Sequence, residues 1–499
     1  MKIVETAEMR AAEAAAIASG TPEFVLMKRA GAAAAALIAA WMRRWRFSRI
    51  VFLCGGGNNA GDALVAATLL DGRYPISVRL AKPLASFHGA AALAAAGLPD
   101  GSKAAASCDL ADLDLRPGDL IVDGMLGIGL TGEVRPRLAE AIDRVNASQL
   151  PVIALDVPSG MDADTGAGCC PGGEAVHAVC TLTFGLPKRG LFTPEGTRFS
   201  GTLVVADIGL NADADTHDGD DAYTEVEAMA SLPRFAADIH KNRRGQLLVM
   251  AGSRRYPGAG ALAALSSLRG GAGLVRSFIP SGVPIRLADA AIPVAIAATE
   301  QGGFARAPEW SEYPGASALI AGPGWGDDVP VSVLEQVLKF PGRLLLDADA
   351  LNLLARHPEA WHKRDGVVLT PHSGEAERLR LAFGIPASGT RSEAAAALAT
   401  RLNAVVVLKG ARTVTADGEG SVTLNTSGSP DLATAGSGDV LAGSIGALLA
   451  NGLETAEAAR LGVFIHGRAG EICGRGCIAD DLPKAIADVL EKLEKGLFF

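Results

Sequence analysis

A short segment near the C-terminal end of the chain places glycines, a serine and one acid directly before an apolar helical pattern. In TAGSGDVLAG (434–443), Asp439 follows a Gly-Ser-Gly turn, and apolar residues then recur at helical spacing up to a glycine placed like a C-terminal cap. The free N–H groups of such a helix start attract anions, and glycines let the backbone approach them closely. Beside an anion site, Asp439 is expected either to cap the helix or to handle a proton.

A glycine- and asparagine-rich segment in the first half, GGGNNAGD (55–62), also follows an apolar run and opens a helix. It looks like a dinucleotide-binding loop, but the next strand ends at Lys82 where that fingerprint expects an acid. Amide oxygens and the Asp62 carboxylate can instead orient a polar ligand or bind a hard cation.

Three further polar residues stand where predicted strands end. They are Asp123, Asp156 and Ser159. Since parallel strands place their carboxyl ends at one edge of a sheet, we expect these side chains to converge there. Asn59, Asp123 and Ser159 would give oxygen ligands to a weakly bound monovalent cation, which leaves Asp156 as a possible proton carrier. Taken singly, each is equally a helix cap or turn residue.

Short apolar runs alternate with helical patterns along the chain, which predicts α/β domains with buried parallel strands. The candidate strands are 49–54, 75–83, 119–124, 151–160, 181–188 and 202–209, then 245–252, 273–279, 317–324, 343–350, 366–372 and 403–410. Between the two series, the acidic stretch 211–227 lacks an apolar period and is expected to connect two domains, 1–220 and 221–499.

Composition narrows the class of protein. With 49% hydrophobic and 20% charged residues the chain is globular, and a net charge of -9 argues against a nucleic-acid binder. The seven scattered cysteines form no CxxC pair, and their odd number favours a reducing compartment such as the cytoplasm. We expect neither a signal peptide nor a membrane span, because the apolar run 30–42 is too short to cross a bilayer.

The first half resembles a known enzyme family. The segments GGGNNAGD, DGMLGIGLTGEVR and ALDVPSGMDADTG resemble the NAD(P)H-hydrate epimerases over residues 1 to about 215. The resemblance implies a Rossmann-like α/β/α sandwich that binds potassium and interconverts the R and S forms of NAD(P)H hydrated at C6, NAD(P)HX. This chain has Ala60 and Ala63 where the family more often has glycine.

The same resemblance implies roles for particular residues. Potassium would be held by Asn59, Asp123 and Ser159, and Asp156 would touch the reacting ring. The remaining residues expected to bind the hydrated nucleotide are Asn58, Asn59, Ala60, Gly61, Asp62, Gly127, Ile128, Gly129, Leu130, Thr131, Gly132 and Glu133.

The second half, from about 225 to 499, resembles ribokinase-like kinases and, more closely, the ADP-dependent NAD(P)H-hydrate dehydratases. The motifs are HKNRRGQLLVMAGS, GPGWG, LLLDADALNLL, LTPHSGEAERL, LKGARTVT and SPDLATAGSGDVLAG, in that order. By this resemblance, Asp439 would face the C6 hydroxyl of the hydrate, and the turn before it would stabilise phosphoryl charge.

The resemblance implies further contacts in this half. Nucleotide contacts would come from Lys409, Gly410, Ala411, Arg412, Thr413, Gly436, Ser437 and Gly438, and substrate contacts from Gly260, Gly324, His372 and Asp439. Asp347 and Asp349 end a strand, where acids of kinases with this fold lie near metal and phosphate, so magnesium is expected beside ADP.

The motifs together predict one enzyme that epimerises NAD(P)HX and dehydrates its S form, with ADP converted to AMP and phosphate. Two alternatives stay open. The second domain could be a small-molecule kinase of the hydroxymethylpyrimidine type, and the first could be a ligand-binding module without catalysis. A homo-oligomer is expected because oligomers are common among soluble enzymes.

Overall fold

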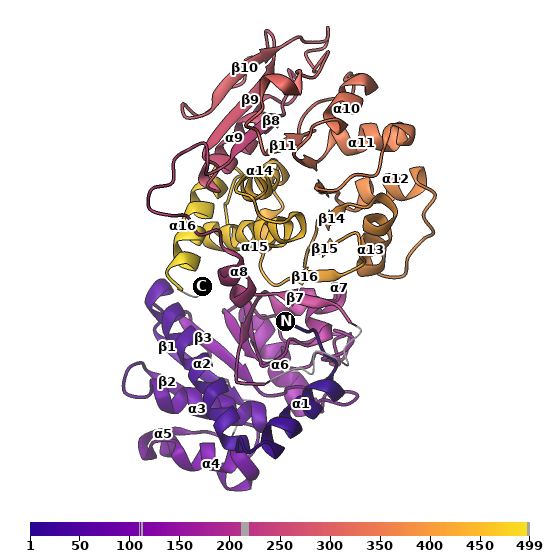
Figure 1. Cartoon of the computed structure of the whole chain (residues 1–499). Coiled ribbons are helices and arrows are strands. Elements are labelled where there is room, and N and C mark those ends of the chain that lie inside the picture. Colours follow the sequence, from indigo (N-terminus) through magenta and orange to yellow (C-terminus); the bar gives the residue numbers. More distant parts are fainter. Residues whose placement is uncertain (109, 111–112, 211–218, 497–499) are drawn as a thin grey trace. The chain divides into compact units, whose positions relative to one another are not determined.

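The computed structural model describes the chain except residues 109, 111–112, 211–218 and 497–499. The chain divides into two compact units, Met1–Gly219 and Asp220–Phe499 (Figure 1). Each unit is built on its own sheet, so each is described by itself.

The first unit contains a parallel sheet with the order β2-β1-β3-β4-β5-β6. Its strands are β1 (Arg49–Cys54), β2 (Ile76–Leu80), β3 (Asp119–Gly124), β4 (Val152–Leu155), β5 (Cys180–Phe184) and β6 (Thr202–Ala206). The four inner strands are almost wholly buried, as expected for a sheet covered on both faces, whereas the edge strands β2 and β6 are mostly half-buried. Each of these strands lies within a run predicted from the sequence, except that β5 begins one residue earlier.

Helices cover both faces of this sheet. They are α1 (Thr6–Ala18), α2 (Glu23–Trp45), α3 (Asn58–Leu70), α4 (Gly89–Gly97), α5 (Asp100–Ala105), α6 (Pro136–Ser148) and α7 (Pro194–Ser200). Successive residues of β1 point to opposite faces: Phe52 joins the core formed with α2, α3 and α4, whereas Val51 and Leu53 join the core formed with α6. The first unit is therefore a three-layer α/β/α sandwich.

Helix α2 is longer than the apolar run 30–42. Its 23 residues make it long and apolar enough to span a membrane by length and composition, so the length argument made from that run does not hold. In the structure α2 is a core helix. Residues such as Leu26, Ala34 and Ile38 are buried, and α2 packs along α3.

The second unit has a mixed sheet with the order β10-β9-β8-β11-β12-β13-β14-β15-β16-β7. Its strands are β7 (Asp221–Tyr223), β8 (Gln246–Met250), β9 (Leu274–Pro280), β10 (Ile292–Ile296), β11 (Ala318–Ala321), β12 (Arg343–Leu346), β13 (Val367–Leu369), β14 (Val405–Leu408), β15 (Val414–Ala416) and β16 (Val422–Asn425). Strand β15 runs antiparallel to both neighbours, and the other pairings are parallel.

The helices of this unit are α8 (Glu225–Ser231), α9 (Pro257–Arg269), α10 (Val331–Leu338), α11 (Asp349–Arg356), α12 (Ser373–Ala382), α13 (Arg391–Leu402), α14 (Ser437–Ala450), α15 (Thr455–Cys473) and α16 (Leu482–Glu494). Helix α14 is buried along its length and lies tightly on the sheet, since a Cβ at Gly446 would come within 2.4 Å of Ile320. This packing fixes where the N-terminus of α14 stands relative to the strand ends.

Part of the predicted connecting stretch 211–227 belongs instead to the second fold. Residues 211–218 lie outside the described part of the chain. Beyond them, β7 pairs with β16, and Thr224 and Glu227 form a reciprocal cap on α8. Three residues are too few to show an apolar period, so sequence patterning missed this edge strand. The same reason applies to β15, and β10 was missed because most of its side chains are exposed or half-buried.

Candidate functional sites

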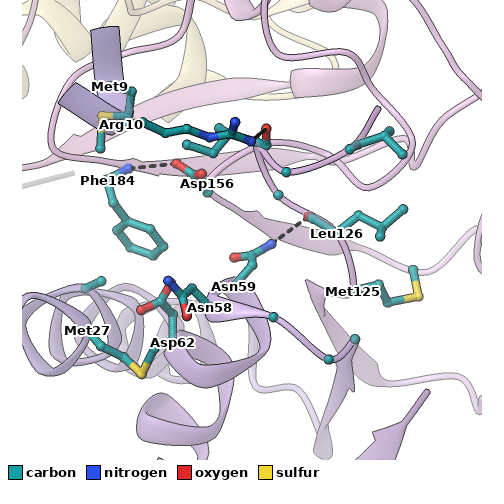
Figure 2. A pocket seen from close by; sticks show the side chains of 18 of the residues that line it. Met9, Arg10, Met27, Asn58, Asn59, Asp62, Met125, Leu126, Asp156 and Phe184 are labelled. Carbon is teal, nitrogen blue, oxygen red and sulfur yellow. Dashed lines mark hydrogen bonds between the residues drawn. The ribbon is translucent and has the colours of Figure 1, made fainter. Parts of the chain in front are cut away.

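A cavity of about 620 Å³ opens in the first unit at the carboxyl ends of its strands. The walls come from α1, α2 and the start of α3, and from the loops after β1, β3 and β4 (Figure 2). Of the residues predicted to bind a hydrated nucleotide, Asn58, Asn59, Asp62, Gly127, Ile128, Gly129, Leu130, Thr131 and Glu133 line it. The sheet topology thus gathers predicted residues from distant segments.

Three of the predicted residues lie elsewhere. Ala60 and Gly61 are buried on faces of α3 away from the cavity, and Gly132, with φ +72°, lies in the turn between lining residues. A Cβ on Gly61 would stand 2.5 Å from the Met27 side chain, so this glycine allows α2 and α3 to pack closely. The methyl group of Ala63 packs toward Gly124, so neither alanine that departs from the family pattern narrows the cavity.

The predicted cation ligands come together beneath the cavity floor. The Ser159 hydroxyl donates to Asp123 Oδ1 at 2.6 Å, and the Ser159 backbone N–H donates to Asp123 Oδ2 at 2.8 Å. Asp123 is wholly buried and has no ion pair with a described residue. Burial, partly offset by these hydrogen bonds, raises the pKa of Asp123 to about 6.

Asn59, the third predicted cation ligand, has an amide oxygen without a hydrogen-bond partner among the described residues. Its amide nitrogen donates to the carbonyl oxygens of Leu126, at 2.7 Å, and Leu155, at 3.0 Å. These two bonds fix the amide so that its oxygen, Asn59 Oδ1, is buried and lacks a hydrogen-bond partner in the described chain. A buried acceptor without a partner costs stability, and a cation would remove that cost.

Asp156 lies at the end of β4 in a left-handed conformation, with φ +66°. Its Oδ1 forms an ion pair with Lys188, whose side chain is fully buried. The Lys188 ammonium also donates to the Phe184 carbonyl at 2.8 Å, and the Phe184 N–H lies 3.5 Å from Asp156 Oδ1 (Figure 2). The predicted proton carrier is therefore held in place as one half of a buried ion pair.

Sequence reasoning missed Lys188 as a member of this site. It is the last residue of the predicted strand 181–188, and that position was the available signal, because ligands gather at strand ends in α/β sheets. Only the fold shows that Lys188 turns inward, whereas Arg189 next to it is exposed.

The second candidate site surrounds the start of α14. Gly436 precedes this helix with φ +89°, a conformation that favours glycine, and a Cβ there would stand 2.6 Å from Leu262. Asp439 lies in the first turn of α14, and Lys409 follows β14 on the facing side. The predicted phosphate loop, acid and lysine therefore lie together.

The charges of this site are strongly coupled. Lys409 Nζ lies 2.7 Å from Asp347 Oδ1 and 3.9 Å from Glu375 Oε2. Burial opposes the charge of Lys409, but the carboxylates outweigh it and raise its pKa. Burial and repulsion from Asp347 raise the pKa of Asp439 to about 7, so this carboxyl can give or take a proton near neutral pH. Glu375 was not predicted, although it follows His372 in the quoted PHSGE motif.

His466 is a second residue that sequence reasoning missed. Its Nε2 lies 3.0 Å from the Ser437 carbonyl oxygen and 3.2 Å from the Ser437 hydroxyl, at the first residue of α14. Burial lowers the pKa of His466 to about 4, so the ring is neutral at pH 7. A neutral ring can donate to the carbonyl and hold the turn without adding charge.

The remaining predicted residues of this unit have clear structural tasks. A Cβ on Gly260 would stand 2.6 Å from the Ala251 carbonyl oxygen, and Gly324 has φ +62°. His372 caps α12, with Nδ1 accepting from the N–H groups of Gly374 and Glu375. Each of these three residues has a structural role of its own, and the substrate contacts expected of Gly260, Gly324 and His372 stay predictions.

The 409–413 turn after β14 is held by its neighbours. Arg391 donates to the carbonyl oxygens of Leu408, Lys409 and Ala411. Inside the turn, Thr413 Oγ1 donates to the Gly410 carbonyl oxygen. Arg412 is buried and donates to the Thr426 carbonyl oxygen, so its guanidinium braces the turn from within.

Comparison with known proteins decides the family. One family model, described as YjeF-related protein N-terminus, matches residues 23–190, and another, described as NAD(P)H-hydrate dehydratase, matches residues 247–492. The bifunctional NAD(P)H-hydrate repair enzyme Nnr of Coxiella burnetii is 36% identical over 519 residues, which cover 96% of this chain and 97% of that protein. The chain belongs to the family of bifunctional NAD(P)H-hydrate repair enzymes.

A second bifunctional relative agrees with this membership. The repair enzyme of the same name from Gloeobacter violaceus is 39% identical over 435 residues, covering 83% of this chain and 82% of that protein. A crystal structure of the ADP/ATP-dependent NAD(P)H-hydrate dehydratase from Bacillus subtilis, co-crystallised with ATP and Mg²⁺, is 29% identical and covers 56% of this chain and 100% of that chain, with a TM-score of 0.46. The family and the α/β fold class predicted from the motifs are confirmed.

Proposed function

We propose that each unit performs one step in the repair of hydrated nicotinamide cofactor. The first unit interconverts the R and S forms of NAD(P)HX, and the second dehydrates the S form with ADP as co-substrate. The observation that carries this function is membership of the bifunctional family along both units. The small-molecule kinase alternative has less support, because the model that matches the second unit describes a dehydratase.

In the first unit, the hydrated ring would lie in the cavity beside Asp156. The loop 127–133 and the start of α3 form the walls on which the rest of the nucleotide would rest. Because the ion pair with Lys188 holds Asp156 at the cavity, this side chain is placed to take a proton from the C6 hydroxyl or from water. This assignment rests on placement at the cavity, on burial and on the ion pair.

The residues beneath the cavity fit a potassium ion. Asn59 Oδ1 is a buried oxygen without a partner, Ser159 supplies a hydroxyl oxygen, and Asp123 carries a buried negative charge without a cationic partner among the described residues. Hard cations prefer oxygen ligands of these kinds. Potassium bound there would neutralise Asp123 and hold the cavity floor in shape, while Asp156 handles the proton.

Removing the charge of Asp123 tests the cation site. We expect Asp123→Asn to abolish the potassium dependence of epimer exchange, because the neutral amide no longer attracts a cation, and to lower the rate at saturating potassium by about 10-fold or more, an estimate from the loss of one charged partner. Initial rates would be measured in potassium and in tetramethylammonium salts at equal ionic strength. Unchanged potassium activation in this variant would contradict the site.

In the second unit, the N–H groups at the start of α14 would bind the transferring phosphoryl group, with Lys409 as a facing cation. The oxygen of the C6 hydroxyl attacks the terminal phosphate of ADP while Asp439 takes the hydroxyl proton. The phosphoanhydride bond of ADP breaks, and AMP leaves. Phosphate then leaves C6, C5 loses a proton, and the ring double bond of NAD(P)H forms. Water is thereby removed overall at the expense of one phosphoanhydride bond.

The donors near Lys409 fit a magnesium ion shared with the nucleotide. No group of three His, Cys, Asp or Glu side chains able to hold a metal occurs among the described residues. Mg²⁺ commonly takes one or two carboxylates together with nucleotide phosphates. Asp347 directly follows β12, and Asp349 begins α11. Magnesium bound there would offset phosphate charge.

One assay tests both steps. A mixture of R and S NADPHX would be incubated with the protein, ADP, magnesium and potassium, and the return of dihydronicotinamide absorbance would be followed. Full recovery, faster than spontaneous epimerisation allows, is expected. Recovery that stops at the S fraction would mean that the first unit is a ligand-binding module only. Absence of recovery, together with phosphorylation of a hydroxymethylpyrimidine, would favour the kinase.

We further propose a cytoplasmic location and a homo-oligomeric state. The seven cysteines are all free in the structure, which accords with a reducing compartment, and α2 is buried in its unit. The oligomer rests on the frequency of symmetric assemblies among soluble enzymes. Light scattering of the purified protein would measure it.

A further inference from the structure

A second carboxyl group in the epimerase cavity has no assigned chemistry. Asp62 comes from the first turns of α3 and lines the cavity, although only 9% of the residue is exposed. Within the described part of the chain, its carboxyl receives no hydrogen bond and forms no ion pair, unlike Asp123 and Asp156. A carboxyl group that lines a cavity and is not engaged by the protein is available to a molecule bound there.

The charges around Asp62 oppose its ionisation. Burial raises the pKa of Asp62 well above its ordinary value, and repulsion from Asp156 and from Glu13 adds to this effect. The Lys188 ammonium offsets it only in part. Asp156 has the opposite surroundings, because Lys188 pairs with it directly and the Thr183 hydroxyl lies 3.4 Å away. When two carboxyl groups share a site and their surroundings differ in this way, one serves as an acid and the other as a base.

The two groups approach the cavity from different elements. Figure 2 shows Asp156 projecting from the end of β4 on one side, and Asp62 projecting from α3 on the other. Both carboxyl groups line the same cavity, so both can reach a molecule bound in it. A planar ring placed between them would meet one carboxyl group on each face.

This arrangement matches what inversion at C6 demands. If the hydroxyl departs as water from one face of the ring, a new water must add on the opposite face to give the other epimer. We propose that Asp62 and Asp156 act as a pair of catalytic residues, with Asp62 protonating the departing C6 hydroxyl and Asp156 taking a proton from the water that adds on the other face. The inference rests on the proposed epimerase function.

The step balances in atoms and protons. The C6–O bond breaks as Asp62 gives its proton, water leaves, and the ring nitrogen donates its electron pair to form an iminium ion. A second water forms the new C6–O bond and loses a proton to Asp156. Asp62 is then ionised and Asp156 protonated, which is the state required for the reverse direction, and exchange with solvent restores the first state.

The direct test replaces the Asp62 carboxylic acid by an amide of equal size. Asp62→Asn is expected to lower kcat for epimer exchange by about 10²–10⁴-fold, the range for loss of a general acid, with KM changed by less than about 3-fold. Glu140→Gln, which removes an exposed carboxylate of α6, is the control and should keep the wild-type rate. A kcat within about 3-fold of wild type for Asp62→Asn would overturn the proposal.

Two further measurements distinguish failure of the proposed carboxyl pair from failure of the epimerase function and from misfolding of the variant. In H₂¹⁸O the wild-type protein should insert one labelled oxygen at C6 for each inversion, whereas inversion without label would mean ring opening and would overturn the pair. If the wild type does not exchange epimers, the proposed function of the first unit fails instead. Because ionisation of Asp62 above pH of about 4 opposes folding, Asp62→Asn should unfold at pH 8 at no lower temperature than wild type, which excludes misfolding as the cause of lost activity.

Discussion

Replacement of Asp439 by asparagine is expected to reduce dehydration of S-NADPHX by about 10²–10⁴-fold, the usual range for loss of a general base. Asparagine keeps the size of the side chain at the start of α14 but cannot accept the hydroxyl proton. The rate of NADPH formation from the pure S epimer, with ADP and magnesium saturating, measures the effect. Epimer exchange by the first unit serves as an internal control and should be unchanged.

The pH dependence of dehydration is a second test of Asp439 as the general base. Its carboxyl has a pKa raised to about 7 by burial and by Asp347, and only the ionised form can take a proton. The rate should therefore be low at pH 6, rise through pH 7 and level off above it. A profile that is flat from pH 6 to pH 8 in the wild type would show that Asp439 does not act as the base.

Replacement of Lys188 by methionine is expected to bring epimer exchange down to its spontaneous rate. The side chain of Lys188 is fully buried, and its ammonium holds Asp156 at the cavity. Without it, the Asp156 charge is left uncompensated near the core, and loss of one partner of a buried pair costs about 3–5 kcal/mol of unfolding free energy. Exchange of R and S NADPHX, together with thermal unfolding of the first unit, measures both effects.

A double variant separates folding from chemistry at this pair. Lys188→Met combined with Asp156→Asn removes both charges, so most of the lost stability should return, while epimer exchange should stay at the spontaneous rate. Dehydration of the S epimer by the second unit should remain at the wild-type rate in each variant. Recovery of exchange in the double variant would show that neither residue handles a proton.

The path of the chain in each sheet was largely predictable from the sequence. Buried parallel strands read as short apolar runs, such as Arg49–Cys54 and Asp119–Gly124, and both were placed correctly to the residue. Both edge strands of the second sheet, β10 and β7, escaped this reasoning, as did the short strands β15 and β16. Ile292–Ile296 has mostly exposed or half-buried side chains, and Asp221–Tyr223 is held by pairing with β16 rather than by its own pattern.

The sequence by itself determined the family and the two halves, and it named the residues of segments 58–62 and 127–133 that line the first cavity, because motif order and strand-end positions are local properties of the chain. The tertiary structure decided which side chains meet. It paired Asp156 with Lys188, 32 positions further on, left Asn59 Oδ1 without a partner among the described residues, brought Asp62 to the same cavity as Asp156, and set Asp439 against Asp347. The physical reason is that charge, burial and hydrogen bonding depend on neighbours in space, and these neighbours come from strands and helices far apart in sequence.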